Sequence, residues 1–385
     1  MLVIPVFVPH AGCPNDCCFC NQKIISGSQK APSAEEIESK IEIYRKAAGR
    51  FNETQIAFYG GSFTAIEPEL QEKYLETVQK YLKINGGFAD KIRLSTRPDA
   101  IDETVIERLL HYNVRIVELG AQSMDDNVLR LSNRGHSAAD TVRASEMLKK
   151  AGIILGLQTM QGLPGADFDG DIRTAEKICG IGPDFVRIYP TVVLKHSRLG
   201  RDYESGVYRA MPLKRMVELC GRLAEMYVER GIKIIRMGLQ TTETISNESE
   251  NSDIIGGPYH EAFGQLVKDY LLEQEVAGVA ECAKTKAGDR LPVHLNIITE
   301  KARISDIYGY KKENLNFFRG LGFKKIHVSA DTESALPLND GLSGNKAVRI
   351  SNEYITEISW NQTNEKPEGE PAYNLTMRVS FSELL

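Results

Sequence analysis

FVPHAGCPNDCCFCNQ, residues 7–22, is the stretch that decides the fold and the chemistry of this chain. It places Cys13, Cys17 and Cys20 at C-x3-C-x2-C spacing in a turn-rich loop, directly after an apolar run, residues 2–8, that predicts a strand. Thiolates are soft ligands for iron–sulfur clusters, zinc or copper(I). Three thiolates on one loop can hold three corners of a cubane cluster and leave one iron open to a cofactor. The spacing therefore predicts a metal centre at the end of the first strand.

Two other interpretations of the cysteines were weighed. His10 with the three cysteines would also satisfy the tetrahedral ligation of zinc. A disulfide scaffold is excluded, because such scaffolds are short, cysteine-rich and secreted, whereas this chain has 385 residues and seven cysteines. Cys18 breaks the ligand spacing, so we expect it to be a small buried side chain.

The composition is that of an ordinary globular protein, with 42% hydrophobic and 26% charged residues. The net charge of −5 argues against bulk attraction to nucleic acid but leaves room for a local basic patch. No apolar segment is long enough to span a membrane, and residues 1–5 lack the basic start of a signal peptide. With four of the seven cysteines clustered, the sequence favours a reducing, cytoplasmic location.

Short strands alternate with helices through the first 240 residues. Strands are predicted at 2–8, 54–59, 91–96, 115–119, 153–159, 185–189 and 232–237. Helices are predicted at 30–49, 67–82, 104–112, 125–131, 138–151, 174–179 and 213–230. Such alternation predicts a parallel sheet of right-handed βαβ units. The expected fold is α/β, a partial (βα)6 barrel of TIM type, with functional residues at the carboxyl ends of the strands.

The strand ends carry polar groups and glycines. Residues 60–63, GGSF, follow the second strand, and two glycines there let the backbone approach a ligand closely. A simple strand-to-helix turn is the alternative for this glycine pair. The later strand ends add Glu118, Gln122, Gln158 and Tyr189, with Arg134 after the fourth strand. Glu118 has a structural alternative as well, the partner of a buried ion pair.

The cysteine spacing, the strand before it and Phe19 resemble the signature of radical S-adenosylmethionine (SAM) enzymes. That resemblance implies a 4Fe–4S cluster on Cys13, Cys17 and Cys20, and SAM as the second cofactor. It implies reductive cleavage of SAM to a 5′-deoxyadenosyl radical, which needs an electron donor of the reduced flavodoxin or ferredoxin type. The GGSF segment is similar to the family's GGE-type motif, so Gly60, Gly61 and Ser62 are expected to bind the methionyl amino group.

The stretch VELGAQSMDDNVLRLSNRGHSAADTVRASEMLKKAGIILGLQTMQGLPG, with FVRIYPTVVLKHSRL after it, resembles the catalytic subunit of Elongator and, more distantly, oxygen-independent coproporphyrinogen oxidase. The resemblance implies that Glu118 and Gln158 contact the SAM ribose and that Arg134 meets the methionyl carboxylate. Gln122 completes the expected SAM-binding set. The acetyltransferase domain of that subunit and its basic N-terminal extension have no counterpart in this sequence, so transfer of its tRNA substrate is doubtful.

Three segments are expected: a radical SAM barrel over 1–240, an acidic linker over 241–257 and a small α/β tail domain over 258–385. The segment GPYHEAFGQLVKDYLLEQ resembles one that follows the barrel in Elongator-like proteins, which makes His260, with Tyr189, a candidate for substrate contact or proton transfer. A local hydrogen bond at a helix start is the alternative for His260. In the tail, Gly309–Lys312 is only weakly similar to a phosphate-clamping GXXG loop, and an exposed charged helix start is the alternative.

The sequence thus predicts a radical SAM enzyme that acts on an unidentified substrate, a small molecule or RNA. Within that class the alternative is an Elongator-like enzyme that modifies tRNA. The alternative from another class is a zinc-containing protein that binds nucleic acid without catalysis. Because Lys311, Lys312, Lys324 and Lys325 are the obvious basic pairs of the tail, we expect only weak phosphate binding and a substrate smaller than tRNA.

Overall fold

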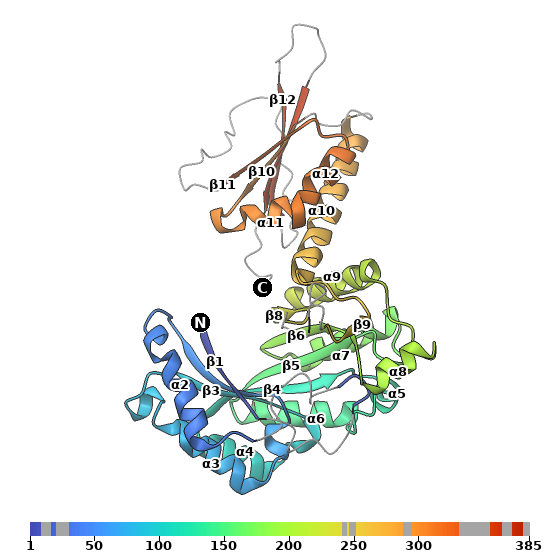
Figure 1. The fold of residues 1–385 in the computed structure, drawn as a ribbon. Coiled ribbons are helices and arrows are strands. Elements are labelled where there is room, and N and C mark those ends of the chain that lie inside the picture. Colours follow the sequence, from blue (N-terminus) through green and yellow to red (C-terminus); the bar gives the residue numbers. More distant parts are fainter. Residues whose placement is uncertain are drawn as a thin grey trace. The chain divides into compact units, whose positions relative to one another are not determined.

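A seven-stranded parallel sheet forms the first unit of the chain, Met1–Glu261, in a computed structural model (Figure 1). The structure describes residues 1–8, 17–20, 31–240, 245, 252–287, 294–330, 355–363 and 372–379. Its strands follow one another in chain order, β1 (Leu2–Phe7), β2 (Thr54–Tyr59), β3 (Lys91–Thr96), β4 (Val114–Gln122), β5 (Ile154–Gln161), β6 (Phe185–Pro190) and β8 (Lys233–Met237). The curled sheet is a partial TIM-type barrel, which confirms the fold predicted from the sequence.

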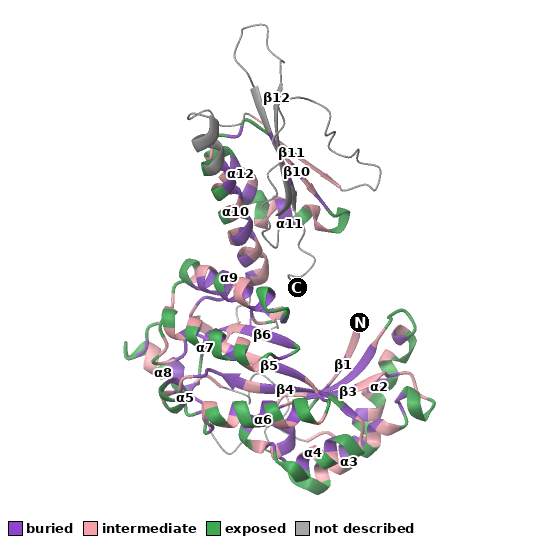
Figure 2. Ribbon diagram, turned by 180° about the vertical axis from the view of Figure 1, so that it is seen from behind, coloured by how far each residue is buried: buried purple, intermediate pink, exposed green. Residues whose placement is uncertain are grey.

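Helices connect the strands and lie against the outer side of the curled sheet (Figure 1). They are α2 (Ala34–Ala48), α3 (Pro68–Gln79), α4 (Glu103–His111), α5 (Asp126–Leu131), α6 (Ala138–Lys150), α7 (Phe168–Ile181), α8 (Arg198–Glu204) and α9 (Leu213–Glu229). A short antiparallel pair, β7 (Val193–Leu194) with β9 (Ile254–Gly256), follows the sixth strand. Figure 2 shows the strands buried and the outer sides of the helices exposed.

The two faces of the sheet differ in chemistry because successive side chains of a strand point to opposite sides. The convex face, under the helices, is aliphatic and aromatic, and each of the following side chains is at most 1% exposed: Ile56, Phe58, Ile92, Leu94, Val117, Leu119, Leu155, Leu157, Val186 and Ile188. Strand register puts a polar set on the concave face, since Arg187 pairs with Gln158, and Glu118 with Ser95 and Gly156. The core of this unit therefore lies between the sheet and its helices.

The second unit, Ala262–Leu385, is a separate small α/β domain. Its four-stranded sheet has the order β11 (Lys325–Ala330), β10 (His294–Thr299), β13 (Ala372–Val379), β12 (Ile355–Thr363), with only the β12–β13 pair antiparallel. Its helices are α10 (Phe263–Ala287), α11 (Ile304–Tyr308) and α12 (Glu313–Gly320).

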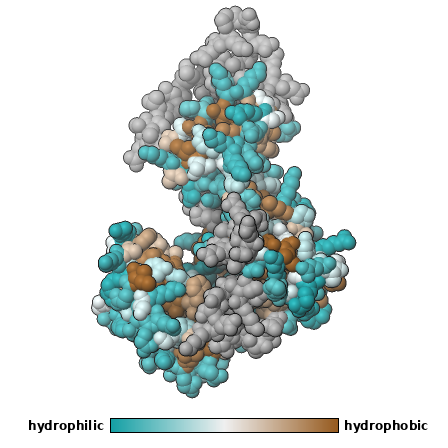
Figure 3. All heavy atoms as spheres, viewed as in Figure 1, coloured by the Kyte–Doolittle hydropathy of each residue, from teal (hydrophilic) through white to brown (hydrophobic). Residues whose placement is uncertain are grey.

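Among the residues that the structure describes, none of the helices is long and apolar enough to cross a membrane. Figure 3 shows a largely hydrophilic surface with scattered hydrophobic side chains.

The domain limits predicted from the sequence stay a prediction. Most of the expected linker, 241–257, lies outside the described residues, but Ile245 and the strand β9 belong to the first unit. Ile245 is buried with Val192, Leu194 and Tyr259. The part of this segment that the structure describes is thus packed on the barrel.

Candidate active site

The described part of the cysteine loop, residues 17–20, is a tight turn fixed to two other parts of the barrel. The Cys20 amide donates to the Cys17 carbonyl at 3.0 Å, which closes the turn. The Cys18 amide donates to the Ser132 carbonyl at 2.9 Å, and the Cys18 carbonyl accepts from the Leu199 amide at 2.8 Å. The loop is therefore positioned by the segment after α5 on one side and by α8 on the other.

Cys18 is a buried side chain, as its spacing predicted. It is 0% exposed and packs in a small cluster with Val193, Leu199 and Tyr208. Burial raises the pKa of its thiol to about 11, although a hydrogen bond with Ser132 lowers it in part. The Cys18 thiol therefore stays protonated at neutral pH, and a protonated thiol is a poor metal ligand.

Cys17 and Cys20 both lie on this one turn, Cys17 buried and Cys20 partly exposed. Cys13, the third expected ligand, and His10, the ligand of the zinc alternative, lie outside the described residues. In the described ranges no three His, Cys, Asp or Glu side chains come together as a metal site. Two soft sulfur donors at one turn, with a third four residues earlier in the sequence, nevertheless suit an iron–sulfur cluster better than a hard cation.

Gly60 holds the end of β2 against the end of β1. Its φ is +104°, and a Cβ at this position would lie 3.2 Å from the Val8 carbonyl oxygen. Only glycine adopts this conformation without strain. Gly61 and Ser62 line a small hollow beside it together with Val8 and Tyr59, and Ser62 is 5% exposed. The expected glycine segment thus lies at the end of β2, beside the end of β1, which precedes the cysteine loop.

Arg134 lies against the cysteine turn. Its Nη1 donates to the Cys17 sulfur at 3.5 Å, and its Nη2 donates to the Gly120 carbonyl at 2.8 Å. A Cβ on Gly120 would lie 2.5 Å from that Nη2 and 2.8 Å from Gln122 Nε2, so a larger residue at 120 would shift the ends of both side chains. Gln122, with a φ of +65°, is 4% exposed. The structure therefore brings Arg134, Gln122 and Cys17 together.

Glu118 is the centre of a buried ion-pair network on the concave face. Arg93 Nε lies 2.5 Å from Glu118 Oε1, and Arg187 Nε lies 2.5 Å from Oε2. The side chains of Glu118 and Arg93 are 4% and 3% exposed. This is the ion-pair alternative weighed for Glu118, and the expected contact of Glu118 with a ribose remains a prediction. Burial lowers the pKa of the Arg187 guanidinium, but the nearby Glu118 carboxylate raises it, and the net pKa lies above the ordinary value for arginine.

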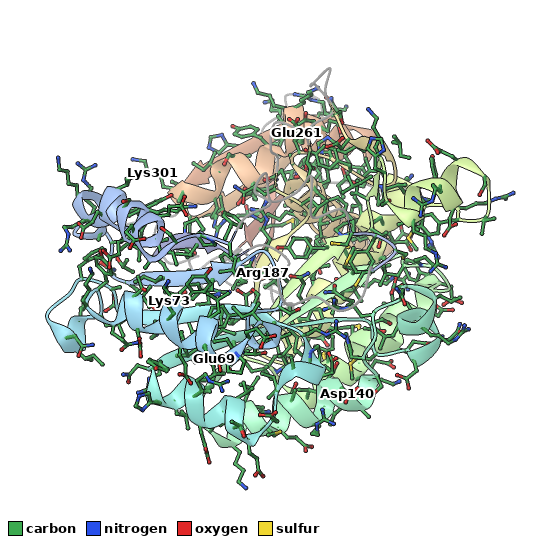
Figure 4. The ribbon with its side chains drawn as sticks, turned by 60° about the horizontal axis from the view of Figure 1, so that its bottom comes forward. Glu69, Lys73, Asp140, Arg187, Glu261 and Lys301 are labelled. Carbon is green, nitrogen blue, oxygen red and sulfur yellow. The ribbon has the colours of Figure 1, made fainter. Side chains whose placement is uncertain are left out.

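Arg187 lies within the curve of the sheet, whereas Glu69, Lys73 and Asp140 lie on the outer helices (Figure 4). Two family models match the chain around this site: "Radical SAM superfamily" at residues 7–178 and "Radical_SAM C-terminal domain" at residues 183–273. Together they span more than half of the sequence, and they include the cysteine turn, the glycine segment and the concave face.

The chain belongs to the radical SAM superfamily. It is a radical SAM enzyme, as the sequence predicted, and it is similar to Elongator proteins.

Named relatives of this radical SAM enzyme agree with that assignment. It is 26% identical over 254 residues to the "tRNA uridine(34) acetyltransferase" of Methanocaldococcus infernus, covering 61% of this chain and 46% of that protein. It is 24% identical over 208 residues to "Elongator complex protein 3" of Saccharomyces cerevisiae, covering 49% of this chain and 37% of that protein. The chain spans less than half of the length of these two relatives.

A solved structure shows the same fold. The archaeal Elp3 of Methanocaldococcus infernus with an N-terminal deletion matches with a TM-score of 0.55 and 21% identity, over 81% of this chain and 67% of that one. At this identity the likeness shows the architecture, and residue roles must come from the chain itself.

Of the two residues proposed for catalysis, Tyr189 lies in the sixth strand and His260 lies after β9. Tyr189, near the end of β6, is partly exposed and accepts a hydrogen bond from Arg187 Nη1 at 3.2 Å. His260 is half-buried and follows Tyr259, whose hydroxyl donates to the Ile245 carbonyl at 2.9 Å. The β7–β9 pair brings the segment after Tyr189 alongside the segment before His260. Tyr189 and His260, which are distant in sequence, thus lie on segments that adjoin the same strand pair.

Three concave-face residues of this radical SAM enzyme were not found from the sequence: Tyr59, Arg93 and Arg187. Each arginine stands between two apolar residues of a strand, in KIRLST or in FVRIYP, and that interruption was the available signal. A separate hollow of about 620 Å³ lies between the β5–α7 loop and residues 207–212, and none of the expected site residues lines it.

Proposed function

We propose that this radical SAM enzyme cleaves SAM reductively and acts on a substrate smaller than tRNA. Cys13, Cys17 and Cys20 would hold a 4Fe–4S cluster, which when bound supplies the electron for cleavage to a 5′-deoxyadenosyl radical. One observation carries the proposal: Cys17 and Cys20 share one turn, and Arg134 donates to the Cys17 sulfur at 3.5 Å while Cys18 is buried away from them.

The remaining residues have assigned tasks in this proposal. Gly60, Gly61 and Ser62 receive the methionyl amino group, because glycines at a strand end leave the backbone open to a ligand. Arg134 and Gln122, which lie beside Cys17, face the methionyl carboxylate. Gln158 is the partly exposed amide of the concave face and binds the ribose. An external one-electron donor of the flavodoxin or ferredoxin type reduces the cluster.

Iron analysis of anaerobically purified protein tests the cluster. We expect about four irons per chain in the wild type, as for a cubane cluster. Cys17→Ser and Cys20→Ser should lose the iron and the brown colour. Cys18→Ser is the matched control and should keep both, because that side chain packs in an apolar cluster. Formation of 5′-deoxyadenosine from SAM with dithionite then tests cleavage. A wild type that fills with zinc and refuses iron would establish the zinc-binding alternative.

Modification of tRNA is the second candidate, because relatives carry the name tRNA uridine(34) acetyltransferase. Lys311 and Lys312 in the second unit both have a positive φ at the start of α12 and form an exposed basic pair. About four tail cations would give a salt slope of at most roughly −3, hence weak binding at physiological salt. Filter binding with total tRNA decides: tight association that Lys311→Glu/Lys312→Glu abolishes would favour RNA over a small substrate.

A further inference from the structure

Arg187 links the buried charges of the concave face to two tyrosines. Its Nη2 donates to the Tyr59 hydroxyl at 3.1 Å, and its Nη1 donates to the Tyr189 hydroxyl at 3.2 Å. The two tyrosines come from β2 and β6, on opposite sides of the strands β3–β5. One guanidinium therefore brings together two hydroxyls from distant strands.

The direction of these hydrogen bonds determines what the hydroxyls can still do. A guanidinium only donates, so both phenol oxygens act as acceptors towards Arg187. Each hydroxyl keeps one proton, and in the described part of the chain neither has a second partner. Both O–H groups are thus free to donate to one acceptor bound beside them.

The charge around the pair is positive. Arg93 and Arg187 share the single carboxylate of Glu118, and Arg93 Nη2 is buried without a hydrogen-bond partner among the described residues. Arg236 on β8 is in register with Arg187 and adds another cation. An excess of cations in a partly buried site is costly unless an anion compensates it. Arg187 is 21% exposed in its side chain, so the positive charge is open to a ligand.

We propose that the hydroxyls of Tyr59 and Tyr189 bind an anionic oxygen of the substrate, a carboxylate or a phosphate, with Arg187 behind them as the compensating charge. The inference rests on the proposed function and names the class of substrate for it. Glu118 is a positioning residue here, because it fixes the guanidinium through Nε and Nη2 and leaves Nη1 to Tyr189. Tyr59 immediately precedes Gly60, so the anion is held next to the glycine segment assigned to SAM.

Thermal unfolding of the cluster-loaded enzyme with saturating SAM tests the anion site. The probes are inorganic phosphate and malonate, each against chloride at equal ionic strength. We expect a saturable rise in Tm in the wild type, and Tyr59→Phe or Tyr189→Phe should each raise the apparent Kd of the probe about tenfold, the loss of one charged hydrogen bond. The double variant should show no saturable rise.

Tyr112→Phe is the matched control, because its hydroxyl donates to Glu76 on the surface at 3.2 Å. It should bind phosphate and malonate like the wild type. An unaltered rise in Tm in the double variant would overturn the inference. A rise in Tm that occurs only when SAM is left out would also overturn it, since the pair would then bind the SAM carboxylate.

Iron content and SAM cleavage in the same preparations separate this inference from the proposed function. A wild type that lacks a cluster refutes the proposed function, whatever the anion does. A wild type that holds the cluster and cleaves SAM, but gains no stability from either anion, refutes only the inference.

Discussion

The two faces of the barrel sheet are built from the same strands and serve different ends. On the convex face, side chains such as Leu94, Leu157 and Ile188 are at most 1% exposed and pack under the helices. On the concave face, the alternate residues Arg93, Glu118 and Arg187 form an ion-pair network instead. Because alternate side chains of a strand point to opposite faces, residues that stabilise the fold and residues that form the polar site alternate along the same strand.

This difference between the faces indicates which substitutions should alter stability and ligand binding independently of each other. A shift of one residue in strand register would exchange the two faces, so the apolar face also determines where the charges lie. Substitutions on the convex face should alter unfolding and leave binding intact. Substitutions at the rim of the concave face should alter binding and leave unfolding intact. Substitutions of the buried charges on that face should alter both unfolding and binding.

Glu118→Gln should have the largest effect, because it leaves two buried arginines without their carboxylate. We expect a loss of about 3–5 kcal/mol in the free energy of unfolding, measured in urea. Glu53→Gln is the matched control, since its pair with Lys91 is about one third exposed on both side chains. That change should cost less than about 1 kcal/mol. Equal losses of unfolding free energy in the two variants would mean that the ion pairs of Glu118 contribute no more to stability than a surface ion pair.

Leu157→Ala breaks the apolar face. The side chain is 1% exposed, so its removal should cost about 3 kcal/mol in the free energy of unfolding by leaving a cavity. Below its lowered Tm the variant should still load iron and bind SAM with wild-type affinity. A specific loss of SAM binding in a folded protein would contradict the separation of the two faces.

Asp171 tests a polar group on the apolar side. It lies on α7, is 2% exposed and accepts a hydrogen bond from the Gly162 amide at 2.8 Å. Burial raises its pKa from 3.8 to about 7. Between these values the folded state binds more protons than the unfolded state, so this group's contribution to stability falls as pH rises and levels off above about pH 7.

Asp171→Asn should therefore be more stable than the wild type by about 4 kcal/mol at pH 8 and about equally stable at pH 4. The asparagine oxygen can still accept from Gly162. His136, whose pKa burial and Arg134 lower to about 4, titrates in the opposite sense in both proteins, so the difference at each pH isolates Asp171. Urea unfolding from pH 4 to pH 8 measures it, and a difference independent of pH would contradict the burial argument.

Gln158→Ala should have the smallest effect on the fold. Its amide is partly exposed on the concave face, so we expect unchanged urea unfolding. SAM affinity should fall by about 1 kcal/mol, one neutral hydrogen bond, measured by calorimetry on the cluster-loaded protein. Unchanged affinity would show that the ribose is bound elsewhere.

Much of the fold followed from local pattern, since apolar runs and turn residues place the seven barrel strands. The helix α7 was predicted only at 174–179 but begins at Phe168. Asp169, Gly170 and Asp171 are residues that favour turns, so the sequence hides the first turn of this helix. In the structure the Asp167 side chain caps the helix by accepting a hydrogen bond from the Gly170 amide. The β7–β9 pair is too short to produce a periodic signal.

The sequence predicts site residues where spacing carries the chemistry, as for the cysteines and Gly60-Gly61, and their binding roles stay predictions. The site was not predictable where distant residues meet. Arg134 contacts Cys17 across 117 positions, and Arg187 contacts Tyr59 across 128. These contacts depend on strand order and register, which a single sequence does not specify.

The shared carboxylate of Glu118 has a consequence for the order of events during synthesis. Its first partner, Arg93, precedes it by 25 residues, whereas Arg187 follows it by 69. At ordinary ribosomal speeds, Arg187 emerges about 3–14 s after Glu118. Until then the nascent barrel can form only a neutral one-to-one pair. The surplus cation, and with it the capacity to attract an anion, arises when the sixth strand joins the sheet.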